Sequence, residues 1–203
     1  GSLYVDGLLH INLTTFKDNR ASSGGAIFLN DTFGKYSTIE NSTFENNNAT
    51  GDGGACFISA DSVHVKDLIF KDNVAGDDGG AFNWEGSYGV IYNITCINNR
   101  GISVNTSSSR GGTISLTGSN VTITKSSFTL SSAYMDESKN YTKVTGGALF
   151  ITGNDVVVND TTFDSCNATN NGGAVYVIGN RNHILNCDFN NCIGRDAGAL
   201  FIN

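Results

Sequence analysis

Short segments in which hydrophobic and polar positions alternate return along the whole chain in the same order. One copy starts at Phe163, has a small polar residue three positions later, and closes with the run Gly172-Gly173-Ala174-Val175. Six further copies start at a phenylalanine or its substitute, namely Phe16, Phe44, Phe70, Cys96, Phe128 and Phe189. Such recurrence is typical of solenoids, in which each repeat stacks on the next. The pattern predicts one repeat domain spanning residues 1–203.

The number of residues from the glycine pair to the next phenylalanine position is nearly constant, whereas the number from the phenylalanine to the glycine pair varies. From the second glycine to the next phenylalanine position there are 16 residues in five of six intervals. Five residues before that position the side chain is always β-branched: Ile11, Ile39, Val65, Ile91, Ile123, Val158 and Ile184. After the glycines, pairs such as Ile27 and Leu29 alternate with period two, which indicates strands.

Each repeat of about 26 residues thus predicts two clear strands and a short third strand around the phenylalanine. No helical pattern lies between them, so we expect an all-β parallel β-helix of about seven coils. Asparagines three positions after the phenylalanine are expected to form an inward ladder, although turn asparagines facing water remain an alternative. This column holds Asn19, Asn47, Asn73 and Asn99, and in the last two repeats Cys166 and Cys192.

The repeat pairs Phe-x-x-Asn with Gly-Gly-Ala followed by an aliphatic residue, as in Phe44–Asn47 with Gly53–Cys56. This pairing resembles the repeats of chlamydial polymorphic membrane proteins and of adhesin-like proteins from methanogenic archaea. The resemblance covers about residues 8–203 and departs from the pattern at Cys96, Thr113 and Ala197. It implies a right-handed parallel β-helix displayed on a cell surface for adhesion, and it supplies no catalytic residues or cofactor.

Net charge and hydropathy argue against a nucleic-acid partner and against insertion into a membrane. The net charge is -7, and nucleic-acid binding needs a basic face, so we expect no nucleic-acid partner. No apolar run approaches 18 residues, so we expect no membrane insertion by this segment. The absence of proline fits a chain that is hydrogen-bonded to neighbours on both sides.

Asn-x-Ser/Thr sequons are frequent and would suit a glycosylated extracellular protein, although a chain rich in these residues produces many by chance. The candidates are Asn12, Asn30, Asn41, Asn48, Asn93, Asn105, Asn120, Asn140, Asn159 and Asn167.

A stripe of aromatic residues is expected on the outer face, three positions after the second glycine of each pair. Its members are Phe28, Phe57, Phe150, Tyr176 and Phe201, with Asn83 and Ser115 between them. We expect outward alanines beside it (Ala26, Ala55, Ala148, Ala174 and Ala199). Such a stripe could bind a sugar ring or a partner surface, or it could simply stabilise the sheet by stacking.

Two long insertions, residues 100–110 and 132–145, fall at the same corner of neighbouring coils and should project together. The second is a candidate recognition loop through Tyr134, Asp136, Glu137 and Tyr141, with tolerated loop drift as the alternative.

Two further clusters could carry chemistry. Asp52, Asp77 and Asp78 could share Ca²⁺, but carboxylates in a glycine loop are more often solvated, so we expect no metal. Cys166 and Cys192 should stack within disulfide range, although buried thiols are the more common case. No converging catalytic set is visible, since the acids and the histidines lie on separate coils.

The sequence therefore predicts an adhesin-like module on the cell surface, bound to a glycan or a protein of another cell and without catalysis. A polysaccharide lyase or hydrolase and a structural wall or filament repeat remain alternatives. No polar cap is visible at either end, so we expect a piece of a longer surface protein whose ends contact neighbouring copies or domains.

Overall fold

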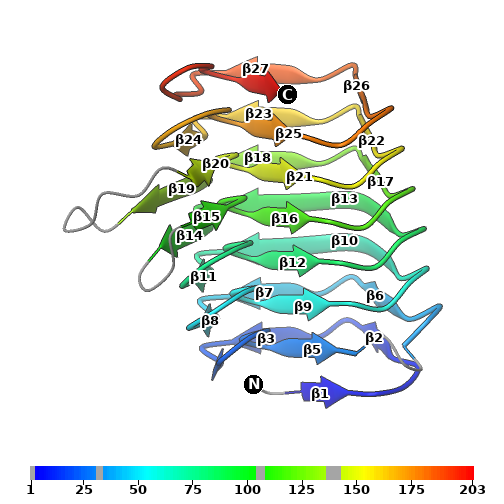
Figure 1. Ribbon diagram of the computed structural model, residues 1–203. Coiled ribbons are helices and arrows are strands. Elements are labelled where there is room, and N and C mark those ends of the chain that lie inside the picture. Colours follow the sequence, from blue (N-terminus) through cyan, green and yellow to red (C-terminus); the bar gives the residue numbers. More distant parts are fainter. Residues whose placement is uncertain (1–2, 31–33, 104–107, 136–142) are drawn as a thin grey trace.

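The computed structural model describes residues 3–30, 34–103, 108–135 and 143–203, and its strands wind into a rod with the two termini at opposite ends (Figure 1). All strand pairs among these residues are parallel, and each strand pairs with its counterparts in the coils before and after it. The described residues contain no helix, and hence none that could cross a membrane. The predicted parallel β-helix is confirmed.

The front sheet, nearer the viewer in Figure 1, has eight short strands. All but the first begin directly after a Gly-Gly-Ala run or its equivalent. Its strands are β1 (Leu3–Val5), β5 (Ile27–Leu29), β9 (Cys56–Ile58), β12 (Phe82–Trp84), β16 (Ile114–Leu116), β21 (Leu149–Ile151), β25 (Val175–Val177) and β28 (Leu200–Ile202).

The back sheet has twelve strands and contains both the β-branched column and the phenylalanine column. The β-branched strands are β2 (His10–Asn12), β6 (Thr38–Glu40), β10 (His64–Lys71), β13 (Val90–Ile97), β17 (Thr122–Thr124), β22 (Val157–Asn159) and β26 (His183–Leu185). The phenylalanine strands are β3 (Thr15–Lys17), β7 (Thr43–Glu45), β18 (Ser127–Thr129), β23 (Thr162–Asp164) and β27 (Asp188–Asn190), while β10 and β13 run through both columns.

A side sheet of six strands follows the phenylalanine, where the sequence has small residues. Its strands are β4 (Arg20–Ala21), β8 (Asn48–Ala49), β11 (Val74–Ala75), β14 (Arg100–Ser103), β19 (Ser132–Met135) and β24 (Asn167–Ala168). The short strand that the sequence predicts around the phenylalanine is present, and it joins the sheet of the β-branched strands. The separate side sheet is formed by the small-residue column, where the sequence predicts no strand. Alanine and glycine have little β propensity, so they gave no strand signal.

The predicted inward columns do form the core. Ile39, Val65, Ile91, Ile123 and Val158 pair in register and are fully buried. Phenylalanine rings stack inside the rod, with ring centroids 4.9 Å apart for Phe44 and Phe70 and 5.1 Å apart for Phe128 and Phe163. Coil length varies more than predicted, because hydrogen-bonded positions on neighbouring coils are 26, 28, 32 or 35 residues apart. The longer spacings contain the two insertions.

The inward asparagine ladder is confirmed. Asn73 is fully buried, and its Oδ1 accepts from the backbone N–H of Asn47 at 3.0 Å. Its Nδ2 donates to the carbonyl of Phe44 at 2.9 Å and to Oδ1 of Asn99 at 2.9 Å. Cys166 continues the pattern with its thiol 3.5 Å from the carbonyl of Phe128. Asparagine and cysteine thus meet the same need, a donor for a carbonyl inside the turn.

The polar corner after the β-branched column adopts the left-handed conformation, as its asparagines and aspartates predict. Asn41, Asp67 and Asn93 have φ of 47°, 55° and 52°. The side chains just before these corners, Glu40, Lys66 and Tyr92, stand on the outer face of the back sheet.

Candidate functional site

The aromatic stripe on the outer face of the front sheet is a pair of stacked ladders. In the first, ring centroids lie 5.3 Å apart for Tyr4 and Phe28 and 4.7 Å apart for Phe28 and Phe57. In the second, Phe150 and Tyr176 are 5.6 Å apart, and Tyr176 and Phe201 are 4.9 Å apart. Interplanar angles of 1° to 14° show that neighbouring rings face each other along the rod. The ladders therefore stabilise the stacking of coils and turn ring edges to the surroundings.

Four of the five alanines beside the stripe are not on the surface, which corrects the expectation, and Ala199 in the last coil is half-buried. Ala26, Ala55, Ala148 and Ala174 are fully buried. The reason is a bend just before each front strand, where the N–H groups of Ala26 and Ile27 both donate to the carbonyl of Ala55. The alanine consequently lies at a corner and not on the outer face of the sheet.

The break between the two ladders holds a polar network. One Arg110 nitrogen lies 2.7 Å from a carboxylate oxygen of Asp78, and the guanidinium carbon is 5.3 Å from the centre of the Phe150 ring. Phe150 is only 3% exposed, whereas Phe28, Phe57, Tyr176 and Phe201 are half-buried. Arg110 thus covers the end of the second ladder, which leaves Phe150 little contact with solvent.

Three carboxylates gather in this network, as the sequence suggested. One oxygen from each of Asp52, Asp77 and Asp78 lies within 4.8 Å of the others. Burial raises the pKa of Asp78 to about 6, although the neighbouring Arg110 opposes the shift. Burial and the nearby charge of Asp52 also raise the pKa of Glu85. Asp78 already accepts from the side chain and the backbone N–H of Arg110, which makes it less available to a metal.

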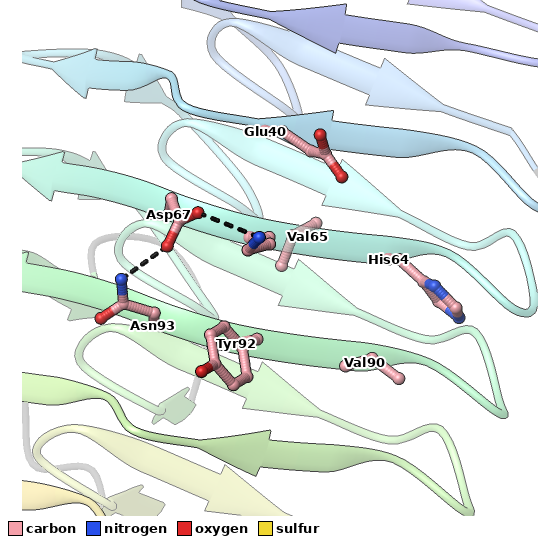
Figure 2. Close-up of a pocket in the computed structure, with 8 residues that line it drawn as sticks. Glu40, His64, Val65, Asp67, Val90, Tyr92 and Asn93 are labelled. Carbon is pink, nitrogen blue, oxygen red and sulfur yellow. Dashed lines mark hydrogen bonds and ion pairs between the residues drawn. The ribbon is translucent and has the colours of Figure 1, made fainter.

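A shallow depression lies on the opposite side of the rod, on the outer face of the back sheet (Figure 2). Strands β6, β10 and β13, with the corners inside β10 and β13, supply its lining. The lining residues are Glu40, His64, Val65, Lys66, Asp67, Val90, Tyr92 and Asn93. Strand pairing places Glu40, Lys66 and Tyr92 side by side in one outward row, and His64 beside Val90 in the next.

Ion pairs and hydrogen bonds fix the corner of this depression. The ammonium group of Lys66 is 3.5 Å from a carboxylate oxygen of Asp67, and Asn93 donates its amide N–H to the other oxygen of Asp67 (Figure 2). Lys125 reaches Tyr92 from the next coil, with its nitrogen 5.4 Å from the ring centre. A hydrogen bond to Tyr92 and the attraction of that group raise the pKa of Lys125.

None of these depression residues is predicted as a binding residue by the sequence. His64 is noted there only as one of the histidines on separate coils, and Asn93 only as a sequon. The sequence does carry one signal: the outward positions Glu40, Lys66 and Tyr92 change chemistry from coil to coil, unlike the inward columns.

The remaining candidate binding residues belong to the second insertion and lie apart from the aromatic stripe and from the back-sheet depression. Tyr134 is half-buried in β19 and pairs with Ile102 of β14, so the described first parts of the two insertions lie side by side. Their other ends pair as β15 (Ser108–Arg110) and β20 (Lys143–Thr145). Asp136, Glu137 and Tyr141 lie outside the described residues.

Most sequons that the structure describes are accessible. Asn12, Asn41, Asn93, Asn120 and Asn167 are exposed. Half-buried positions are Asn30, Asn48 and Asn159, and the sequon asparagines Asn105 and Asn140 lie outside the described residues.

The cysteines are all free thiols in this structure. Cys166 is buried and Cys192 half-buried, in the column that asparagine holds elsewhere. A hydrogen bond from the Cys166 thiol lowers the pKa of Cys192 to about 7.

Two stretches of the chain, residues 13–30 and 41–59, match the family model of the Chlamydia polymorphic membrane protein repeat. Each stretch contains one Phe-x-x-Asn segment and the Gly-Gly-Ala run that follows it. No curated protein and no solved structure matches the chain. The resemblance seen in the repeats is therefore confirmed: the chain carries polymorphic membrane protein-like repeats, and they fold as a parallel β-helix.

Proposed function

We propose that this chain is an adhesin-like module of a cell-surface protein, which binds a glycan or a protein on another cell through its outer faces. The match to the Chlamydia polymorphic membrane protein repeat supports a surface location. Exposed sequons such as Asn12 and Asn120 are compatible with an extracellular, glycosylated protein. Display on a rod also suits adhesion, because coils stacked in one direction carry a binding face away from the anchoring surface.

The observation that carries the proposal is the closed interior of the rod. Phe44, Phe70, Phe128 and Phe163 fill it and are fully buried, as are β-branched residues of the same sheet such as Ile39 and Ile91. A close-packed interior has no room for a ligand, so a partner has to contact the outer faces or the insertions. Both outer faces carry aromatic and charged groups suited to such contact.

The proposed role does not include catalysis. The ionisable groups of the depression stand on an open sheet face, and Lys66 is engaged by Asp67. In the polar network of the front face, Asp78 is engaged by Arg110. Because Lys66 and Asp78 are held by these neighbouring side chains, we assign both arrangements a role in binding and not in catalysis. Sugar release from polyuronides or mucins by the purified chain would instead favour a carbohydrate-active enzyme.

Adhesion can be measured with the chain coupled to beads and a panel of host and microbial cells. We expect the beads to retain at least one cell type above beads that carry an unrelated β-sheet protein. Phe57→Ala and Tyr176→Ala together should lower retention severalfold if the front ladders contribute, and Tyr92→Ala tests the back sheet. Retention no better than the control beads, for every cell type, would rule out the adhesive role.

A further inference from the structure

Two cysteines occupy the inward asparagine column in the last two coils. Cys166 and Cys192 hold the position three residues after Phe163 and Phe189. A backbone hydrogen bond joins the two coils at this point, because the N–H of Ile193 donates to the carbonyl of Cys166 at 2.9 Å. The two cysteines are therefore direct neighbours along the rod.

The two thiols bond less well than the asparagines of the other coils. Asn73 donates to the carbonyl of Phe44 at 2.9 Å, and its other amide hydrogen reaches the next asparagine. The sulfur atoms of Cys166 and Cys192 lie 3.5 Å and 3.7 Å from the corresponding phenylalanine carbonyls. A thiol carries one proton and is a weak donor, so these carbonyls lose little when the thiols are consumed.

The spacing of this pair suits a disulfide. Cα atoms of paired residues on neighbouring parallel strands are about 4.8 Å apart. Disulfides join Cα atoms that are about 4.4 to 6.8 Å apart, so rotation of the two side chains toward each other can bring the sulfur atoms together. The remaining cysteines have other neighbours: Cys56 and Cys96 pair with aliphatic and aromatic residues, and Cys187 lies beside Thr161. Among the described residues, which include all five cysteines, only Cys166 and Cys192 adjoin in one column.

The surroundings of the two thiols give them different reactivity. Cys166 is buried, whereas Cys192 is half-buried and so can be reached by a small reagent. The hydrogen bond from the Cys166 thiol stabilises the thiolate of Cys192 and lowers the pKa of Cys192 to about 7. The thiolate is the form that attacks a disulfide bond. Cys192 is therefore the attacking thiol, and Cys166 is the thiol that follows it.

We propose that Cys166 and Cys192 form a reversible disulfide between the last two coils by exchange with a small external disulfide. The thiolate of Cys192 attacks one sulfur of the external disulfide, whose S–S bond breaks and releases one thiolate. The sulfur of Cys166 then attacks the sulfur of Cys192 and displaces the second external thiolate. Two protein thiols are oxidised, one external disulfide is reduced to two thiols, and the two protons end on the released thiols. This chemistry does not depend on the adhesive role.

The test treats the whole folded chain with glutathione disulfide. Trypsin cuts after Arg181, so it separates Cys166 in residues 144–181 from Cys192 in residues 182–195. Mass spectrometry of the unreduced digest should show these two peptides linked, and fragmentation should place the link at Cys192 and not at Cys187. A parent chain that stays unlinked after prolonged treatment, or a link through Cys187, would overturn the proposal.

Single variants assign the two roles. Cys166→Ser should keep a glutathione attached to Cys192, because the second thiol is missing. Cys192→Ser should form no link and should gain at least tenfold less glutathione adduct at Cys166. Cys187→Ser is the matched control, a half-buried cysteine of the same coil, and should form the link at a rate within twofold of the parent. Adducts on Cys166 as fast as on Cys192 would contradict the assigned order. If a serine variant does not fold, the parent and Cys187→Ser still decide whether the bond forms.

The bond should also hold the last coil against its neighbour, because it closes the loop of chain that joins the two coils and so restricts the opened state. Amides of β26 and β27 should exchange at least tenfold more slowly in the oxidised parent than in the reduced parent. Cys192→Ser after the same treatment should show no such slowing, and addition of dithiothreitol to the oxidised parent should reverse it. Equal exchange in the oxidised and reduced parent would show that the bond does not join the coils as proposed.

Discussion

Asp78 lies in the turn before a front strand and, through Arg110, contacts the aromatic stripe on the outer face. Its carboxylate accepts from the backbone N–H of Arg110 at 2.8 Å and pairs with the guanidinium of the same residue. The side chain is only 11% exposed, so its negative charge is poorly solvated. The arrangement holds Arg110 over Phe150 at the edge of the front ladders. A surface feature therefore depends on a nearly buried carboxylate.

This carboxylate should make stability depend on pH. Burial raises the pKa of Asp78 from 3.8 to about 6 in the folded chain. Between those pH values the folded state binds more protons than the unfolded state, so the contribution of Asp78 to stability is full below about pH 4 and is lost as pH rises through 6. Asp78→Asn cannot take up the proton. The stability of the parent relative to Asp78→Asn should rise by on the order of 1–3 kcal/mol between pH 7 and pH 4.

Urea unfolding of both proteins at several pH values measures this difference, and other titrating groups cancel because both proteins contain them. The amide that Asp78→Asn introduces keeps an oxygen for the N–H of Arg110, so the comparison isolates the charge. A parallel pH dependence in the two proteins would show that Asp78 is ionised normally in the folded chain.

At the scale of elements, the sequence predicts the strands whose inward residues recur in type from coil to coil. It misses the elements that show no such recurrence of strand-forming residues. The columns of Ile39 and Phe44 are found because each side chain packs on its own kind in the next coil. The side sheet is missed because its inward residues, such as Ala49 and Ala75, are chosen for small size and not for β propensity. Burial of Ala55 is missed because a bend, and not the alternation of a strand, sets its direction.

The residues of the back-sheet depression are harder to predict from the sequence, because their residue types do not repeat. Glu40, Lys66 and Tyr92 are neighbours in one outward row but do not stack on residues of their own kind, so they share no pattern that would join them in the sequence. The aromatic stripe was conspicuous because its residues do repeat, and the structure accounts for that repetition by ring-on-ring packing. In a solenoid, repetition indicates packing first, and a departure from repetition on the outer face is the better pointer to a specific site.

The Gly-Gly turn gives a prediction at this scale. A Cβ at Gly80 would collide with the carbonyl oxygen of Gly112 and with the backbone of Arg100, neither of which can move without shifting a whole coil. We expect Gly80→Ala to destabilise the chain by about 3 kcal/mol or more, the upper range for overpacking. A Cβ at Gly7 would meet nothing within 4 Å, so Gly7→Ala is the matched control and should change stability by less than about 0.5 kcal/mol. Thermal and urea unfolding measure both, and equal stability of the two variants would contradict the close approach of the coils.

At the scale of the whole molecule, each coil is stabilised by the coils on either side of it. Central residues such as Val65, Ile91 and Ile123 are completely buried, whereas their counterpart Ile184 in the last coil is only half-buried. Phe189 and Leu200 are likewise only partly buried, and Ile202 is 66% exposed. Coils that have one neighbour bury less apolar surface, so their local stability should be lower.

The rate of amide hydrogen exchange in the 203-residue chain should therefore be lower in the central coils than in the last coil. Amides of β12 and β13 sit between coils on both sides, and we expect them to exchange on the order of 100-fold more slowly than those of β26 and β28. Exchange followed by mass spectrometry, with peptides that each cover one coil, measures the gradient under native conditions. Partial unfolding of the last coil opens few contacts, whereas a central coil opens only when its neighbours also separate, so the gradient should persist at moderate urea. Uniform protection across all coils would mean that the rod unfolds as one cooperative unit, and the nearest-neighbour description of its stability would then be wrong.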